Sequence, residues 1–139
     1  MTIKFRGLWA LAALALVAGC GQDAERDQAG GIVAEGAVDV FTMHVGDCFD
    51  DQADEENGID SVPGKPCNEP HDNEVFYKFD VSLSDWPGDD AMEELGYNEC
   101  LKHFQSYVGQ TYEDSSLEVY SIRPTSNSWN RLNLSLIHI

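Results

Sequence analysis

The chain has 139 residues, and its 8 Lys and Arg against 25 Asp and Glu give a formal net charge of −17. This balance argues against nucleic-acid binding, where affinity comes mostly from basic side chains that neutralise phosphates, and against electrostatic attraction to anionic lipid headgroups. Hydrophobic residues make up 42% of the chain, enough for the core of one domain, so disorder throughout is not indicated.

The first twenty residues have the arrangement of an export signal. Lys4 and Arg6 provide a basic start, an apolar run of Leu and Ala follows, and small residues precede Cys20. The apolar run is shorter than the roughly 20 residues that span a bilayer. Its ending resembles a bacterial lipobox, which implies that residues 1–19 are a lipoprotein signal and that Cys20 is lipidated. The alternative is an ordinary cleaved signal in which Cys20 has no role.

A polar segment follows the signal. Residues 20–36 are predicted to be the lipidated Cys and a flexible tether, since residues 21–31 are GQDAERDQAGG. The signal accounts for two of the eight basic residues and for none of the acidic ones, so the exported part keeps six against 25. Three Cys residues remain beyond Cys20, an odd number, and outside the cytosol Cys residues tend to pair.

The remaining pattern predicts a small α+β fold with an antiparallel sheet and one principal helix. Alternation of apolar and polar residues predicts strands in residues 36–41, 75–81 and 117–122, and VPGKP at 62–66 predicts a turn. Apolar spacing predicts a helix over 89–108, with an Asp N-cap, Gly109 as C-cap and Cys100 facing the core.

Three separated pieces of the sequence together resemble the bacterial septum formation domain family. They are VGDCF at 45–49, CNEPHDNEV at 67–75, and the helix around Cys100 followed by YVG at 107–109, Pro124 and Ser128-Trp129. The resemblance implies a domain over residues 37–129 in an exported, membrane-anchored module of actinobacterial type. It also implies that Cys48 pairs with Cys67, which makes the fold disulfide-stapled.

The last ten residues diverge from the family pattern. The resemblance implies a fourth Cys soon after Trp129 as the partner of Cys100, and residues 130–139 contain none. Alternation of Leu with polar residues in this tail fits a native edge strand, and a foreign tail is the competing explanation. We favour a non-native tail, because it also explains the unpaired Cys100.

The polar motif around His71 is the candidate site. Glu69, His71, Asp72, Glu74 and the separate Trp129 are candidate binding residues, although core or rim packing is the main interpretation of the Trp129 ring. No metal is predicted, because the spacing matches no zinc pattern. A structural role is the main interpretation, in which the imidazole is hydrogen-bonded to the backbone; ligand binding and catalysis are the alternatives.

Two other groups of residues in the sequence suggest chemistry. A nucleophilic pair of Cys100 with His71 or His103 is disfavoured, because the thiol is predicted to face the core. The acidic stretch is interpreted as solvated charge, with weak calcium binding as the alternative. Its seven carboxylates are Asp47, Asp50, Asp51, Asp54, Glu55, Glu56 and Asp60.

These observations predict a protein that is not an enzyme and has no cofactor. The expected function is a lipid-anchored module on the extracytoplasmic face of the cell membrane, related to septum formation and the envelope. It would act by binding an envelope protein or a cell-wall partner. The alternatives are an envelope ligand- or metal-binding protein and a cell-wall hydrolase.

Overall fold

The computed structural model describes residues 22–52 and 58–132. The predicted export signal, the lipidation of Cys20, three of the loop carboxylates (Asp54, Glu55 and Glu56) and the end of the tail lie outside these described residues. Within them, no helix is long and apolar enough to cross a membrane.

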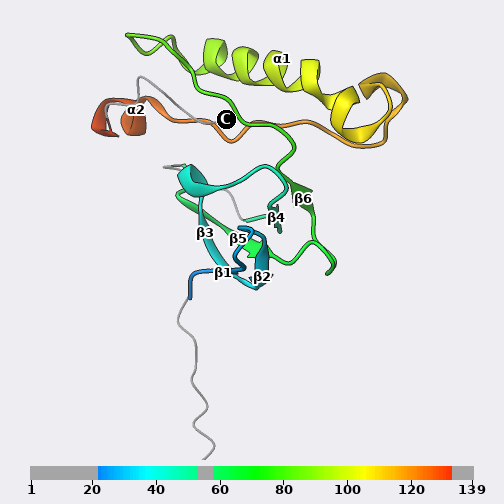
Figure 1. Cartoon of the computed structure of the whole chain (residues 1–139). Helices are drawn as coiled ribbons and strands as arrows, with labels where there is room; N and C mark the ends of the chain where they lie inside the picture. Colours follow the sequence, from blue (N-terminus) through cyan, green and yellow to red (C-terminus); the bar gives the residue numbers. More distant parts are fainter. Residues whose placement is uncertain (1–21, 53–57, 133–139) are drawn as a thin grey trace, which may run out of the picture.

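A four-stranded antiparallel sheet forms the lower layer of the molecule in Figure 1. Its spatial order is β3 (Gly36–Asp39), β5 (Ser61–Lys65), β4 (Cys48–Phe49) and β6 (Asn73–Glu74). A second antiparallel pair, β1 (Glu25–Arg26) with β2 (Ile32–Ala34), lies beside it, and the 3-10 turn η1 (Val40–Thr42) follows β3. The core of this layer consists of Ile32, Val38, Met43, Phe49 and Val62.

The predicted tether is wrong for its described residues, because they pack onto the sheet. The Ala24 amide donates to the Ala37 carbonyl, and the Ala37 amide donates to the Gln22 carbonyl, both at 2.9 Å. Gly36 allows this approach, since a Cβ there would lie 2.5 Å from the Ala24 nitrogen. The folded unit therefore includes residues 22–36, before the predicted boundary at residue 37.

The turn predicted at residues 62–66 is also wrong, because these residues form most of the central strand β5. Pro63 lies opposite Ala37 of β3, and its carbonyl accepts the Asp50 amide at 3.0 Å. A residue's nitrogen and carbonyl point to the same side of a strand, so the missing Pro63 donor faces the side of β4. The β4 ladder ends at Phe49, so the missing donor lies at the end of this ladder and costs at most the reciprocal bond to Asp50.

The upper layer is built on α1 (Asp89–Val108), whose bounds match the predicted helix. Met92, Gly96, Cys100 and Phe104 are buried at four-residue spacing, which confirms that Cys100 faces the core. Gly109 is the left-handed C-cap, as predicted, with a φ of 88°. The predicted Asp N-cap is wrong: the cap is Gly88, whose φ is 101°, and no side chain caps this end.

A shorter helix and a 3-10 turn complete the upper layer. The turn η2 (Tyr112–Asp114) follows α1, and α2 (Ser126–Leu132) comes after it along the chain. Trp129 lies within α2, so the predicted domain boundary after Trp129 falls inside a helix. Two antiparallel sheets, one main helix and a disulfide confirm the α+β class.

Two of the three predicted strands are absent. Residues 75–79 and 117–122 belong to no strand, and they run between the sheet and α1 (Figure 1). Their apolar side chains divide between clusters: Val75 and Ile122 pack on the sheet core, whereas Phe76, Tyr77 and Val119 pack with α1 residues. Because neighbouring residues contact different layers, these segments fill the space between layers instead of extending the sheet.

A candidate binding cavity between the sheet and the helix

A cavity of about 380 Å³ lies where the two central segments meet α1. Residues 71–78 and 117–122 line it along two stretches of main chain, and Cys100, Phe104 and Tyr107 line it from the helix. Met43 and Phe49 contribute from the sheet layer. Its volume falls in the range of small-ligand pockets, about 300–1,000 Å³.

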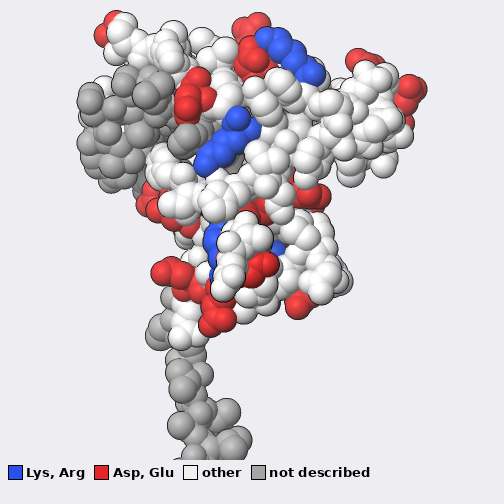
Figure 2. All heavy atoms as spheres, viewed as in Figure 1, with Lys and Arg blue, Asp and Glu red and all other residues white. Residues whose placement is uncertain are grey.

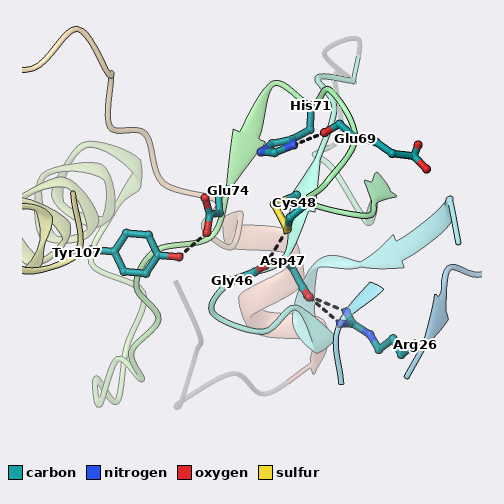
Figure 3. Close-up of a disulfide and its surroundings, with 9 residues drawn as sticks. Arg26, Gly46, Asp47, Cys48, Glu69, His71, Glu74 and Tyr107 are labelled. Atoms are coloured by element: carbon teal, nitrogen blue, oxygen red, sulfur yellow. Dashed lines mark hydrogen bonds and ion pairs between the residues drawn. A yellow bond between two sulfur atoms is a disulfide. The ribbon is translucent and has the colours of Figure 1, made fainter. Parts of the chain in front are cut away.

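The Cys48–Cys67 disulfide fixes the segment that carries His71. The Cα atoms of the two residues are 5.3 Å apart, within the range for a bridge, and the structure contains the pairing that the family resemblance implies. Strand β4 begins at Cys48, and β6, at the end of the segment that starts with Cys67, pairs with β4. The crosslink therefore holds both ends of the polar motif against the sheet (Figure 3).

Glu74 connects this motif to α1. The Tyr107 hydroxyl donates a hydrogen bond to the Glu74 carboxylate, as Figure 3 shows. This bond is the main cause that raises the pKa of Tyr107 to about 12, with burial and the Glu74 charge adding to it. Tyr107 itself stays 43% exposed, so the pair lies at the edge of the cavity. The sequence predicts Glu74 as a candidate binding residue, but it indicates no role for Tyr107 beyond the family motif.

His71 has the structural contact that the main interpretation predicted. Its Nδ1 lies 2.8 Å from the Glu69 carbonyl oxygen, so the backbone of Glu69 orients the ring. The Glu69 side chain is exposed and points away from His71 in Figure 3, and it does not line the cavity. His71 is half-buried and lines the cavity, so its ring is accessible to a group bound there.

Asp72 also lines the cavity, whereas Trp129 does not. The Asp72 carboxylate accepts the Asp51 amide at 3.0 Å. Trp129 is 5% exposed, packs with Val81 and Met92, and its ring centre lies 5.5 Å from that of Trp86. The ring of Trp129 therefore belongs to the core, which confirms the packing interpretation and excludes the alternative binding role.

The described residues contain one group with metal-like geometry. Single ligand atoms of Cys48, His71 and Glu74 lie within 4.8 Å of one another. The Cys48 sulfur belongs to the disulfide, however, and metals bind the thiolate form of cysteine. Only an imidazole and a carboxylate remain, fewer than the three protein ligands of a catalytic zinc site.

The Cys100 thiol is a poor nucleophile in this environment. It is 4% exposed, and burial, followed by the neighbouring Glu99 charge, raises its pKa. His103 instead stacks on Tyr77, with ring centres 3.7 Å apart. Both features oppose a reactive Cys–His pair, which needs a lowered thiol pKa.

The acidic stretch does not behave as one solvated cluster. Asp47 is 3% exposed and forms a two-bond ion pair with Arg26, at 2.6 and 2.7 Å. Asp50 pairs with Lys65 at 2.9 Å, and the Asp51 carboxylate accepts a hydrogen bond from the Asn73 side chain. The solvated interpretation is wrong for Asp47, whose basic partner lies in the segment predicted as a tether.

The model of the septum formation family matches residues 45–133, which is more than half of the chain. The chain belongs to the septum formation family. This assignment connects it with cell division and the cell envelope. No curated protein and no solved structure matches the chain.

The matched part of the septum formation domain contains the whole candidate site apart from two residues of the sheet layer. The disulfide, the polar motif, α1 and residues 117–122 all lie inside 45–133, whereas Val40 and Met43 precede it. The cavity therefore lies almost wholly in the part of the chain that the family model matches. Residues 22–44 add strands β1, β2 and β3 and the Arg26–Asp47 ion pair to the sheet layer.

Proposed function

We propose that this septum formation protein is a lipid-anchored module on the extracytoplasmic face of the cell membrane. In this proposal it binds an envelope protein or a cell-wall partner and catalyses no reaction. The cavity between sheet and helix is the observation that carries the binding part. Its apolar floor, polar edge and exposed rim are typical of binding sites.

The rim supports binding to a partner. Tyr107, Leu117 and Tyr120 line the cavity and are 43%, 55% and 53% exposed. Large apolar side chains grouped at the mouth of a pocket are typical of interaction sites, and tyrosine is enriched there. The partner would cover these three side chains when it enters the cavity.

Location outside the cytosol is supported by two independent features. The lipobox-like ending at Cys20 is an export and anchoring pattern, and the Cys48–Cys67 disulfide fits an oxidising compartment. Replacing Cys20 with Ala should release the protein from the membrane fraction, because the acyl chains would be lost. Continued membrane association of Cys20→Ala, with no incorporation of labelled fatty acid by the wild type, would contradict the anchor.

A non-catalytic role is supported by the side chains at the cavity. The pKa values of Cys100, Tyr107 and Tyr120 are all raised, so these groups stay protonated at neutral pH. A nucleophile or general base needs a pKa shifted toward neutrality instead.

Partner binding is tested by crosslinking in cells. A photoreactive amino acid at Leu117 should yield a covalent adduct, because Leu117 lies on the rim of the cavity. Leu83 is the matched control, since it is exposed but does not line the cavity. Equal adducts from both positions, or none from Leu117, would exclude this site.

A small envelope ligand is the second candidate, and the cavity volume of about 380 Å³ favours it. The same crosslinking experiment distinguishes a small ligand from a macromolecular partner by the mass of the adduct. Crosslinking to a macromolecule shifts the protein on a gel, whereas a small ligand adds only its own mass to the peptide that contains Leu117.

A further inference from the structure

We propose that the cavity accepts an extended strand of a partner protein. The strand pairs with the main chain of residues 117–122 and presents alternating apolar and basic side chains. This inference rests on the proposed partner-binding function and specifies the chemistry of the partner.

The first support is a strand-forming segment that lacks a strand partner. Residues 117–122 are LEVYSI, rich in the β-branched and aromatic residues that favour strands. Among the described residues, no amide or carbonyl of 118–122 is hydrogen-bonded to another backbone group. Such a stretch offers donors and acceptors to an added strand, as in β-strand addition to sheet edges.

The second support is the lining of the cavity. It is lined by eight consecutive residues, 71–78, and by six consecutive residues, 117–122. A site lined along two stretches of main chain can present backbone donors and acceptors to an extended peptide. Val119, which is 9% exposed, lies in the middle of 117–122, so an entering strand would meet this segment beside the core.

The third support is the distribution of apolar surface. Met43, Phe49, Phe76 and Phe104 line the cavity from three different parts of the fold. Alternate side chains of a bound strand point to the same face, and this apolar wall would receive one set of them. The other set would point toward the exposed rim, where Tyr120 lies.

The fourth support is charge. Asp72, Glu74 and Glu118 line the cavity, whereas Lys78 is the basic residue among the lining side chains. The Lys78 ammonium is held by the Met43 carbonyl at 2.5 Å. On the face shown in Figure 2, acidic side chains are spread over both layers and outnumber the basic ones. Basic side chains on the incoming strand therefore complement the site.

The test uses the full chain and three synthetic peptides. The first is an acetylated eight-residue peptide that alternates valine with lysine, the second replaces lysine with glutamate, and the third is the lysine peptide with alternate backbone nitrogens methylated. Methylation keeps the side chains and removes the donors of a strand. We expect the lysine peptide to bind at least about tenfold more tightly than either of the others, a difference of about 1.4 kcal/mol.

Hydrogen exchange gives the location of binding. The lysine peptide should slow exchange of alternate amides within residues 118–122, because an added strand pairs with every second residue along this edge. Equal affinity of the methylated peptide, or no protection in this segment, would overturn strand addition.

A variant pair tests the main-chain contact from the protein side. Ser121 lines the cavity, and Ser121→Pro removes its amide donor, whereas Ser121→Ala keeps the amide. Peptide affinity should fall about tenfold in Ser121→Pro and stay within about twofold in Ser121→Ala. If Ser121→Pro does not fold, the methylated peptide decides the same question on the wild-type protein.

The outcomes separate this inference from the proposed function. A crosslinked partner at Leu117 together with equal binding of the methylated peptide would leave partner binding intact and exclude strand pairing. Absence of both the crosslink and peptide binding would exclude both proposals. Peptide binding that appears only after removal of residues 133–139 would identify the end of this chain as the occupant and overturn the partner proposal.

Discussion

At the scale of single residues, the Asp47 carboxylate is a buried charge that accepts three hydrogen bonds. Its carboxylate accepts two hydrogen bonds from Arg26 and one from the His44 amide at 2.7 Å. Arg26 also donates to the Gly30 carbonyl at 2.7 Å, so this one guanidinium joins the β1–β2 turn to the loop before β4. The pair fixes residues 25–34 on the rest of the sheet layer.

Arg26→Ala should therefore destabilise the fold strongly. It leaves the carboxylate of Asp47, which is 3% exposed, without its partner, and breaking a buried pair costs about 3 kcal/mol. Urea unfolding measures the loss. The matched control is Arg123→Ala, since Arg123 pairs with a Glu93 side chain that is 65% exposed, and it should cost less than about 1 kcal/mol. Equal costs for the two variants would contradict the structural role of Arg26.

The same pair predicts an acid-sensitive stability. Burial alone would raise the pKa of Asp47, but hydrogen bonds from Arg26 and the His44 amide outweigh burial, and the pKa is lowered. A carboxyl whose pKa is lower in the folded state stabilises the fold above its unfolded pKa of about 3.9. This contribution is lost as the pH falls through the folded-state pKa.

Denaturant midpoints measured from pH 7 down to pH 2 test this dependence on Asp47. The wild type should lose stability below about pH 4, and Asp47→Asn should show a smaller loss over the same window because the titrating group is absent. A parallel pH profile in the two proteins would assign the acid sensitivity to other carboxylates.

Tyr107 gives a second prediction at this scale, in the alkaline range. Its pKa of about 12 is caused first by the hydrogen bond to Glu74. Because the folded pKa is raised, the bond stabilises the fold below pH 10 and is lost as the pH rises through about 12. Glu74→Gln should return the Tyr107 pKa toward 10, as measured by NMR titration of labelled tyrosine. Tyr120 serves as the internal control, because its pKa of about 12 arises chiefly from burial and should not move.

At the scale of elements, the Cys48–Cys67 disulfide stabilises the pairing of two strands that is held by few hydrogen bonds. Strands β4 and β6 contain two residues each. Strand β4 begins at Cys48, and β6 follows six residues after Cys67, so the disulfide links the two strands. Isolated strands this short are marginal, so the crosslink compensates for a short ladder. It also holds His71 and Glu74 beside the cavity.

The Cys48→Ser/Cys67→Ser double variant should lower the free energy of unfolding by about 3 kcal/mol, the value for a loop of about this length. The bridge spans a sequence separation of 19. Denaturant unfolding with and without reductant provides the control, since reductant should destabilise the wild type and leave the double variant unchanged. A wild type that is insensitive to reductant would contradict a stabilising role for the bridge.

The central segments show why local patterns are limited at this scale. Residues 117–122 have a strand pattern that is correct as a preference, yet the fold offers them no backbone partner among the described residues. Residues 61–65 show the reverse case. Their sequence VPGK is typical of a turn, yet they form the strand between β3 and β4. Pro63 is tolerated because β4 ends at Phe49, a fact about a neighbour that its own sequence does not contain.

At the scale of the whole molecule, the carboxylates in the described part of the acidic stretch are distributed rather than gathered into an ion site. Three of the four described carboxylates of the acidic stretch have separate partners: Asp47 has Arg26, Asp50 has Lys65, and Asp51 has Asn73. Each is held in place by its own contact. A calcium ion needs six to eight oxygen ligands that converge on one point.

Calcium should therefore leave the thermal stability unchanged. We expect the Tm in millimolar calcium to equal that in the same concentration of magnesium, since a ligand that binds only the folded state would raise it. An increase of Tm with calcium alone would show that the acidic stretch forms a cation site after all.

The candidate site could be anticipated only in part. The motif around His71 is visible in the sequence, because its charged residues lie between Cys67 and a strand-like run that starts at Val75. Tyr120 and Glu118 are not, since their position opposite this motif depends on how residues 117–122 cross beneath α1. For Trp129 the sequence leaves packing and binding open, and the contacts with Met92 and Trp86 decide for packing.

The sequence by itself determined what depends on near neighbours along the chain: the span of α1, its Gly109 cap, the inward face of Cys100, the α+β class and the family. These follow from i to i+4 spacing and from local motifs. Tertiary structure decided what depends on residues far apart. Arg26 neutralises Asp47 across 21 residues, Pro63 enters a central strand, and two strand-like segments enclose a cavity instead of joining a sheet. Each depends on which distant groups satisfy a charge or a backbone hydrogen bond, and folding alone brings those groups together.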